Sequence, residues 1–241
     1  MTLSIEPLQV TSLKEACVSR LEELILSGEL KAGERLPSER DFAARLGVSR
    51  PVLHEALVDL SAKGLVSIQP RRGVVVNDFR TSGSCAILSS LLAYHNGNLD
   101  PDFIASLLAM RVLVETETAR LAAIHATPDQ LRELTEIFNQ EQNCDRVDPA
   151  PLTELDFRFH LAIAIASGNL VYPLILNSFK NVYTRFTGAF FKHSTDSAVL
   201  DEVLAFHRKL LTAIRAHDAE NAADVMRELL LHGESILKKH L

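Results

Sequence analysis

Apolar side chains in the N-terminal part of the chain follow two different periods. Over residues 13–26, 38–45 and 49–63 they recur every three or four positions, which predicts three amphipathic helices. Residues 65–69 and 74–76 are short β-rich runs, and the Pro-Arg-Arg-Gly sequence between them predicts a hairpin. Helix, helix, tight turn, helix and hairpin is the order of a winged helix-turn-helix.

Beyond residue 85 every apolar pattern has the helical period, and we find no strand, internal repeat or low-complexity tract in the sequence. The predicted helical stretches are 86–95, 101–125, 128–144, 152–167, 171–193, 198–216 and 219–239. The predicted fold class is therefore mainly α, with an antiparallel all-α bundle as the second domain. We expect an N-terminal winged helix-turn-helix with a small β-hairpin wing over 1–78, a linker over 79–85, and the helical domain over 86–241.

Composition and cysteine usage indicate a globular cytoplasmic protein. Hydrophobic residues make up 47% and charged residues 23% of the chain. Cys17, Cys85 and Cys144 are widely separated, which suits reduced thiols and offers neither a disulfide framework nor a paired-cysteine metal site. No secretory signal is found, and no apolar run approaches the roughly 20 residues of a membrane span. We therefore expect no membrane partner.

The net charge of −6 does not exclude a nucleic-acid partner, because the acidic surplus is confined to one part of the chain. Residues 1–80 contain 11 Lys/Arg and 11 Asp/Glu, whereas the remainder contains 14 and 20. Local charge decides phosphate binding, so the predicted winged helix can bind double-stranded DNA.

The third predicted helix has the features of a recognition helix. Arg50 and His54 lie one turn apart, near its N-terminal end and away from its apolar stripe. Arg50 can form a bidentate contact with guanine, and His54 a weaker base or phosphate contact. Ser49 and the helix N-terminus can hold a phosphate. The candidate DNA-binding residues are Arg40, Ser49, Arg50, His54 and, at the hairpin tip, Arg71 and Arg72. Taken singly, each is also readily explained as ordinary solvated charge.

Four sequence segments carry a specific resemblance. They are Leu-Pro-Ser-Glu-Arg-Asp-Phe-Ala over 36–43, Leu-Gly-Val-Ser-Arg over 46–50, Glu-Ala-Leu over 55–57 and Gly-Leu-Val over 64–66. Together they resemble the DNA-binding domain of the GntR family of transcription regulators. The family usually has an arginine where this chain has His54, so the resemblance implies a different operator or a weaker base contact at that position.

In the helical part, Asp156 and His160 are spaced i, i+4, so both side chains leave one face of a helix and can bind one divalent ion. His207, on a later helix, completes three ligands if the two helices face each other. The alternative is that Asp156 caps a helix or forms a salt bridge while His160 is a hydrogen-bonded core histidine. Three ligands with an open position is also how catalytic zinc is held, which would suit a metal-dependent hydrolase. No obvious general base accompanies the trio, so we do not expect an enzyme.

Residues 84–240 resemble the ligand-binding domain of FadR-type GntR regulators. The resemblance rests on Arg111 with Glu115, on residues 156–160 and 166–169, and on His207 with the segment that follows it. It implies a metal, zinc or nickel, that helps to bind a carboxylate effector, and no organic cofactor. The fourth histidine of the pattern falls on Leu229, and His232 is three residues further along.

Residues 167–177, with Tyr183 and Arg185, instead resemble the acyl-CoA-responsive fatty-acid regulators, which generally lack the metal ligands. Effector identity therefore stays open between an organic acid and an acyl-CoA. Arg111 is the candidate partner of an effector carboxylate, although an ion pair with Glu115 is equally consistent with its spacing. Asn169 is also readily explained as a helix-end cap. The effector-binding candidates are Arg111, Asn169, Tyr183 and Arg185.

The sequence thus predicts a ligand-responsive transcription regulator, a repressor or an activator, that binds a palindromic operator as a homodimer. A dimer is expected because one winged helix reads only a short half-site. The rival interpretations are the hydrolase described above and an architectural DNA-binding protein with no effector.

Overall fold

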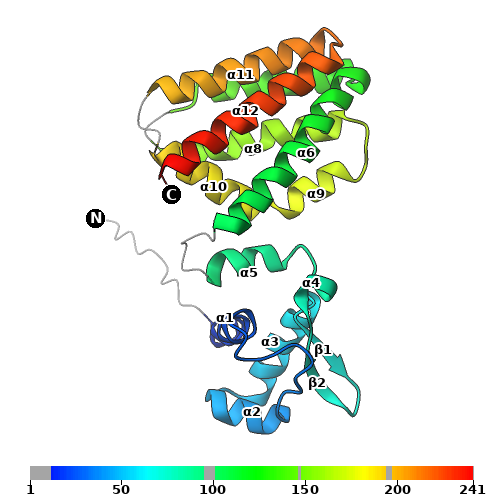
Figure 1. Cartoon of the computed structure of the whole chain (residues 1–241), viewed down its shortest axis with the longest axis vertical. Helices are drawn as coiled ribbons and strands as arrows, with labels where there is room; N and C mark the ends of the chain where they lie inside the picture. The colour runs from blue at the N-terminus through cyan, green and yellow to red at the C-terminus, as the bar shows by residue number, and fades with distance from the viewer. Residues whose placement is uncertain (1–11, 95–100, 146–147, 194–196, 241) are drawn as a thin grey trace, which may run out of the picture. The chain divides into compact units, whose positions relative to one another are not determined.

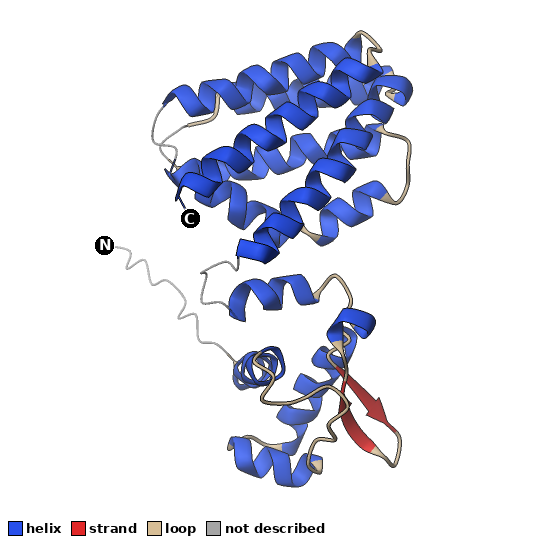
Figure 2. Ribbon diagram, in the orientation of Figure 1, coloured by secondary structure: helices blue, strands red, loops and turns tan. Residues whose placement is uncertain are grey.

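The computed structural model describes residues 12–94, 101–145, 148–193 and 197–240, and it divides the chain into two compact units, 1–98 and 99–241. The chain is mainly α, and the strands lie in the first unit (Figure 2). The predicted fold class is confirmed. No helix in the described ranges combines the length and apolar content needed to cross a bilayer.

The first unit has the order of a winged helix-turn-helix (Figure 1). Its elements are α1 (Leu13–Leu26), α2 (Glu39–Leu46), α3 (Arg50–Ala62), β1 (Val66–Gln69), β2 (Gly73–Val76), α4 (Phe79–Ser82) and α5 (Ile87–Tyr94). The helices begin where the sequence offers caps: the hydroxyls of Ser38 and Ser49 accept from backbone N–H groups in the first turns of α2 and α3. Gly47 ends α2 with φ 68°, a left-handed conformation that glycine adopts without strain.

The core of this unit lies where α1, α3 and the hairpin meet. Its fully buried side chains come from all three, and they include Leu21, Leu53, Leu57, Leu60, Leu65 and Val76. The hairpin is antiparallel, with Val66 opposite Val76, and a bridge from Arg35 to Val75 adds a third segment beside β2. The wing is thereby fixed against the turn that precedes α2.

The helix α5 belongs to the first unit, through a buried polar cluster. Lys63, at the end of α3, lies 2.5 Å from the Glu22 carboxylate of α1, and the Ser90 hydroxyl of α5 donates to the same carboxylate at 2.7 Å. Ile87 joins the apolar core of the unit. The expected domain boundary at 79–85 therefore differs from the division in the structure, which falls after residue 98. An apolar helical pattern does not show which domain the helix covers.

The second unit is a bundle of helices. They are α6 (Pro101–His125), α7 (Pro128–Gln142), α8 (Pro149–Ala166), α9 (Tyr172–Ser178), α10 (Lys180–His193), α11 (Ser197–Arg215) and α12 (Ala219–His240). The longest helices, α6 and α12, pack side by side (Figure 1). Helix α8 contacts α6, α7, α9 and α10, and its side chains are buried on most of its circumference. Asp156 and His160 are among these buried side chains and therefore face the interior of the bundle.

One predicted helix of the bundle is two in the structure. The stretch 171–193 is interrupted at Phe179, whose φ of −97° and ψ of 1° leave the helical region between α9 and α10. The apolar spacing continues across the break, because Leu176 and Val182 are both buried. Periodicity alone could not locate the turn.

Candidate functional site

The recognition helix α3 presents the predicted pair of side chains at its N-terminal end. Arg50 and His54 are exposed, whereas the apolar stripe that includes Leu53 and Leu57 is buried in the core. The Ser49 hydroxyl accepts from the backbone N–H of Val52, so its oxygen is part of the cap. The structure thus leaves the two predicted base-reading side chains accessible to a major groove.

A carboxylate that sequence analysis missed lies between these two side chains. The Glu39 carboxylate, in the first turn of α2, accepts from Arg50 Nε at 3.4 Å and from His54 Nδ1 at 3.1 Å. Partial burial raises the pKa of Glu39, but the hydrogen bonds from His54 and Arg50 lower it by more, so its pKa lies below the ordinary value. Glu39 stays ionised at neutral pH. Its position in the motif that resembles the GntR family was the available signal.

The remaining predicted DNA-binding residues are exposed on the same unit. Arg71 has a positive φ of 63° at the hairpin tip, and the backbone N–H of Arg72 donates to Gln69 O at 3.0 Å. Arg40 on α2 lies 3.5 Å from Asp41 and is largely free of the fold. Arg35 was not among the sequence candidates. Its guanidinium lies beside Gly73, so that a Cβ on residue 73 would be 3.4 Å from Arg35 Nε. Three arginines therefore lie at the wing: Arg71 and Arg72 at its tip, and Arg35 on the segment beside β2.

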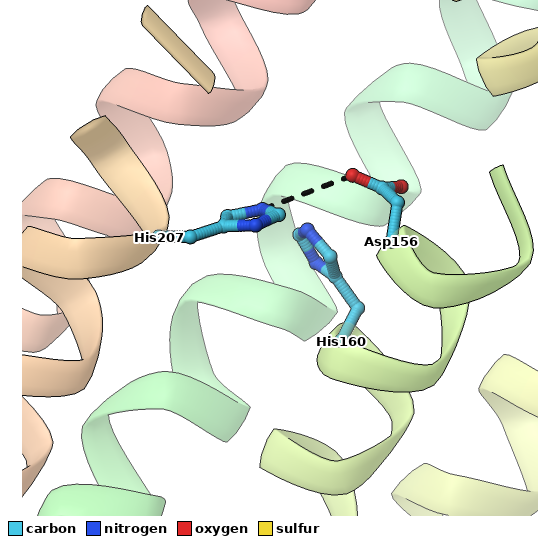
Figure 3. Close-up of side chains that lie close together, drawn as sticks. All are labelled: Asp156, His160 and His207. Carbon is cyan, nitrogen blue, oxygen red and sulfur yellow. Dashed lines mark ion pairs between the residues drawn. The ribbon is translucent and has the colours of Figure 1, made fainter. Parts of the chain in front are cut away.

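The three predicted metal ligands converge in the second unit. Asp156 and His160 on α8 and His207 on α11 point toward one another (Figure 3), and one ligand atom from each lies within 4.8 Å of the others. His207 Nε2 is 3.7 Å from Asp156 Oδ1, and all three side chains are buried. The predicted convergence of α8 and a later helix is therefore present.

Two further carboxylates hold the histidines from behind. His160 Nδ1 donates to Glu115 at 2.5 Å and His207 Nδ1 donates to Glu141 at 2.9 Å, because a carboxylate can only accept. Each neutral imidazole then has its lone pair on Nε2. The buried Nε2 of His207 has no hydrogen-bond partner among the described residues. Metal-binding histidines are typically held in this way by an outer carboxylate.

The electrostatics of the cluster favour positive charge. Burial lowers the pKa of His207, but Glu141 and Asp156 raise it by more, so its pKa lies above the ordinary value. Burial alone would raise the pKa of Glu115, but the positive charge of Arg111 and the contact with His160 lower it to about 2. When both histidines are neutral, the cluster contains the three carboxylates of Glu115, Glu141 and Asp156 and the one guanidinium of Arg111. A divalent cation would neutralise the surplus negative charge. The residues present therefore fit a divalent metal ion.

Arg111 forms the ion pair with Glu115 that its spacing allowed. Its Nε donates to Glu115 at 2.6 Å, and its guanidinium lies 4.1 Å from the centre of the Tyr183 ring. The Tyr183 hydroxyl donates to Asp156 at 2.8 Å, and burial raises the pKa of Tyr183 well above its ordinary value. Arg111 and Tyr183 thus contact both the candidate metal site and the adjoining cavity.

That cavity has a volume of about 50 Å³. Its polar lining is made by Arg111, Asp156, His160, Tyr183, Thr187 and Glu234. The rest of its lining is largely apolar and includes Leu108, Phe186, Phe190, Phe191, Leu229 and Leu237. Space of this size holds a few water-sized groups.

The other sequence candidates lie outside this lining. Asn169 caps a turn, since its side-chain oxygen accepts from the backbone N–H groups of Val171 and Tyr172. Arg185 is exposed on α10. His232 lies 2.9 Å from Glu202, whereas Leu229 faces the cavity in the place of the expected fourth histidine. The structure thus groups Arg111 and Tyr183 with the candidate metal ligands and separates Asn169 and Arg185 from them.

A winged helix-turn-helix joined to a helical domain that contains a partly polar cavity is the arrangement expected of a DNA-binding transcription regulator. Residues 13–76 match the family described as bacterial regulatory proteins, gntR family, and residues 106–232 match the FCD domain. The chain belongs to the GntR family, with the FadR-type arrangement of an N-terminal DNA-binding domain and a C-terminal effector-binding FCD domain.

Relatives with known names agree with this family. The chain is 32% identical over 232 residues to the transcriptional regulator Mce2R of Mycobacterium tuberculosis, covering 95% of this chain and 92% of that protein. It is 30% identical over 206 residues to the fatty acid metabolism regulator protein of Proteus mirabilis, with coverage of 86% and 82%. It is also 30% identical over 236 residues to the putative L-lactate dehydrogenase operon regulatory protein of Escherichia coli K12, with coverage of 94% and 87%.

Solved structures share the fold. Lar of Listeria monocytogenes aligns over 96% of this chain and 99% of its own, with a TM-score of 0.64 and 20% identity. E. coli McbR/YncC aligns over 96% and 99%, with a TM-score of 0.53 and 21% identity. At these identities the likeness concerns the fold alone.

Proposed function

We propose that a small carboxylate metabolite controls the DNA affinity of this regulator, and that it binds beside a divalent metal ion held by Asp156, His160 and His207. The observation that carries the proposal is the arrangement of the two histidines. Each has its Nδ1 fixed by a buried carboxylate, so that Nε2 is left for a metal, and the Nε2 of His207 is without a partner among the described residues.

The choice of metal follows from the ligand types. Two imidazoles and one carboxylate suit zinc or nickel better than magnesium or calcium, which prefer oxygen ligands. Such an ion would supply positive charge to a carboxylate effector. Arg111, which lines the cavity together with Asp156 and His160, offers a guanidinium that can bind a carboxylate through two N–H groups.

The size of the cavity favours a small acid over an acyl-CoA. About 50 Å³ accommodates a few heavy atoms, which is less space than an acyl chain requires. The acyl-CoA alternative is supported by the apolar lining, by Leu229 in place of a histidine, and by relatives named as fatty acid metabolism regulators. These features keep it as the second candidate.

We further propose that the protein acts as a homodimer on a palindromic operator, in the cytoplasm where bacterial DNA lies. Two-fold symmetry doubles the short site that one winged helix can read. Effector binding would favour one placement of the two DNA-binding units over another. By linkage, effector and operator must then change each other's affinity by the same factor. The three-ligand site is proposed to regulate and not to catalyse, since the family and the named relatives are regulators.

Native mass spectrometry of the purified protein tests these points together. The proposal expects a dimer that carries a zinc- or nickel-sized mass, which is absent in His207→Ala. His232→Gln is the matched control, because it removes a histidine outside the triad and should keep the metal. A metal-free dimer with a coenzyme A-sized adduct would overturn the metal proposal and establish the second candidate.

A further inference from the structure

Glu39 shares one carboxylate between the two side chains expected to read bases. One oxygen accepts from Arg50 Nε and the other from His54 Nδ1. Both partners are largely exposed, with side-chain exposures of 72% and 53%, whereas that of Glu39 is 22%. A carboxylate partly covered by the fold thus holds two accessible side chains.

This contact fixes the hydrogen-bonding character of His54. A carboxylate can only accept, so Nδ1 of His54 must carry a proton. In the neutral ring Nε2 then has a lone pair and can only accept a hydrogen bond. Arg50 is held through Nε, and its terminal N–H groups have no partner among the described residues. Those groups are the ones that pair with guanine O6 and N7.

We propose that Glu39 is a specificity-determining positioning residue, which makes His54 a hydrogen-bond acceptor and leaves the terminal N–H groups of Arg50 for guanine. The inference rests on the DNA-binding role of the first unit and is independent of any effector or metal. It assigns opposite polarity to two neighbouring base contacts: a donor at Arg50 and an acceptor at His54.

The base preference follows from the donors that bases display in the major groove. Adenine offers N6–H and cytosine N4–H, whereas guanine and thymine offer only acceptors there. On the strand that His54 faces, we expect adenine or cytosine in preference to guanine or thymine. An arginine at this position, which can only donate, would have the reverse preference.

The first test measures the tautomer of His54 in the full-length protein at a pH where the ring is neutral. Two-bond nitrogen–proton correlation NMR with isotope-labelled histidine distinguishes a protonated Nδ1 from a protonated Nε2. The signal of His54 is identified by its absence in His54→Gln. We expect protonated Nδ1 in the wild type and a larger share of protonated Nε2 in Glu39→Gln. A wild-type ring protonated mainly on Nε2 would overturn the proposal.

The second test measures base preference. The full-length protein selects its site from a library of random DNA duplexes, and affinities are then measured for all four bases at each selected position. The base position that His54 contacts is the one at which His54→Gln should no longer discriminate among the four bases. At that position the proposal expects Glu39→Gln to reduce the preference for adenine or cytosine by about fivefold, the worth of one hydrogen bond.

Asp41→Asn is the matched control. It removes one carboxylate from the same helix, where Asp41 contacts Ser38 and Arg40 and not the reading pair. Both variants should bind all sequences somewhat more tightly, because each removes a negative charge near phosphate. Only Glu39→Gln should change the preference at the His54 position. The same base profile in both variants would show that Glu39 contributes general charge alone and would overturn the proposal.

Discussion

His207 Nε2 lies 3.7 Å from Asp156 Oδ1, while the opposite ring nitrogen of His207 donates to Glu141. The imidazole is therefore aligned between an outer carboxylate on α7 and a candidate ligand on α8. This alignment makes the outer carboxylate testable, because it should orient the ring and increase its basicity toward a metal.

Glu141→Gln should weaken metal binding without removing a ligand. The amide cannot carry a negative charge, so removal of the outer carboxylate should reduce zinc or nickel affinity by about 10- to 100-fold. Competition with a chromophoric chelator would measure the change. Glu136→Gln, an exposed carboxylate on the same helix, should leave the affinity unchanged. Equal affinities in the wild type and Glu141→Gln would argue against a metal at this site.

The spacing of Asp156 and His160 predicted a shared helix face, because four residues make about one turn. His207 could be joined to them only on the condition that its helix faces theirs, which the family resemblance supported and helix spacing alone does not determine. Glu115 and Glu141 were not predicted as partners of the histidines, since they lie 45 and 66 residues from them in sequence. A helical pattern shows which side chains share a face, but not which faces meet in the bundle.

Arg50→Ala should reduce specific DNA binding by roughly 1–3 kcal/mol and relax the preference at one base position. The reason is the removal of the N–H groups that can pair with guanine. Fluorescence anisotropy with the selected duplex and its single-base variants measures both effects. If operator affinity does not change, Arg50 is not a reading residue.

Arg71→Ala combined with Arg72→Ala should weaken binding to all sequences and reduce its salt dependence. Both side chains are exposed at the wing, where they can bind phosphates or the minor groove. For each phosphate that a side chain no longer neutralises, the slope of log K against log salt should decrease in magnitude by about 0.9. An unchanged slope would show that the wing arginines do not bind phosphate.

The pKa of Glu39 should rise when the two reading residues, Arg50 and His54, are replaced. His54 and Arg50 hold its pKa below the ordinary 4.5, whereas burial opposes them. In the double variant Arg50→Ala, His54→Ala only burial remains, so the pKa should rise above 4.5. The wild-type interaction stabilises the fold above pH 4.5, and this contribution disappears as the pH falls through the lowered pKa.

Carbon-13 NMR of the glutamate carboxyls measures this titration, with the Glu39 signal assigned by its absence in Glu39→Gln. The single variants should give intermediate values. A wild-type pKa at or above 4.5 would contradict the hydrogen bonds described for Glu39.

Removal of α5 should destabilise the DNA-binding unit. A fragment ending at residue 78, the expected boundary, lacks the Ser90 hydroxyl and exposes apolar core surface that Ile87 covers. A fragment of residues 12–94 should therefore melt at a higher temperature than a fragment of residues 12–78. In a unit of this size, each kcal/mol in the free energy of unfolding shifts the melting temperature by about 4–8 °C. Circular dichroism melting measures the difference. Equal melting temperatures would restore the boundary expected from sequence.

The order of elements in that unit was readable from caps and periodicity, because Ser38, Ser49 and Gly47 act locally. The placement of α5 was not, because it depends on the hydrogen bond from Ser90 to Glu22, 68 residues away in sequence. The break at Phe179 was hidden for a related reason: buried residues on both sides preserve the apolar period.

Leu229→His should strengthen metal binding. Leu229 is buried and lines the cavity with Asp156 and His160, so an imidazole there can provide a fourth ligand. Removal of an outer carboxylate costs about 10- to 100-fold in affinity, so addition of a direct ligand should be worth about tenfold or more. Chelator competition measures the gain. Leu231→His, exposed on the same helix, should have no effect. Leu229→Ala, with thermal melting of all three variants, separates the ligand from the change in packing. If Leu229→His folds and binds zinc or nickel no more tightly than the wild type, the ligands of α8 and α11 do not hold a metal on the side that faces Leu229.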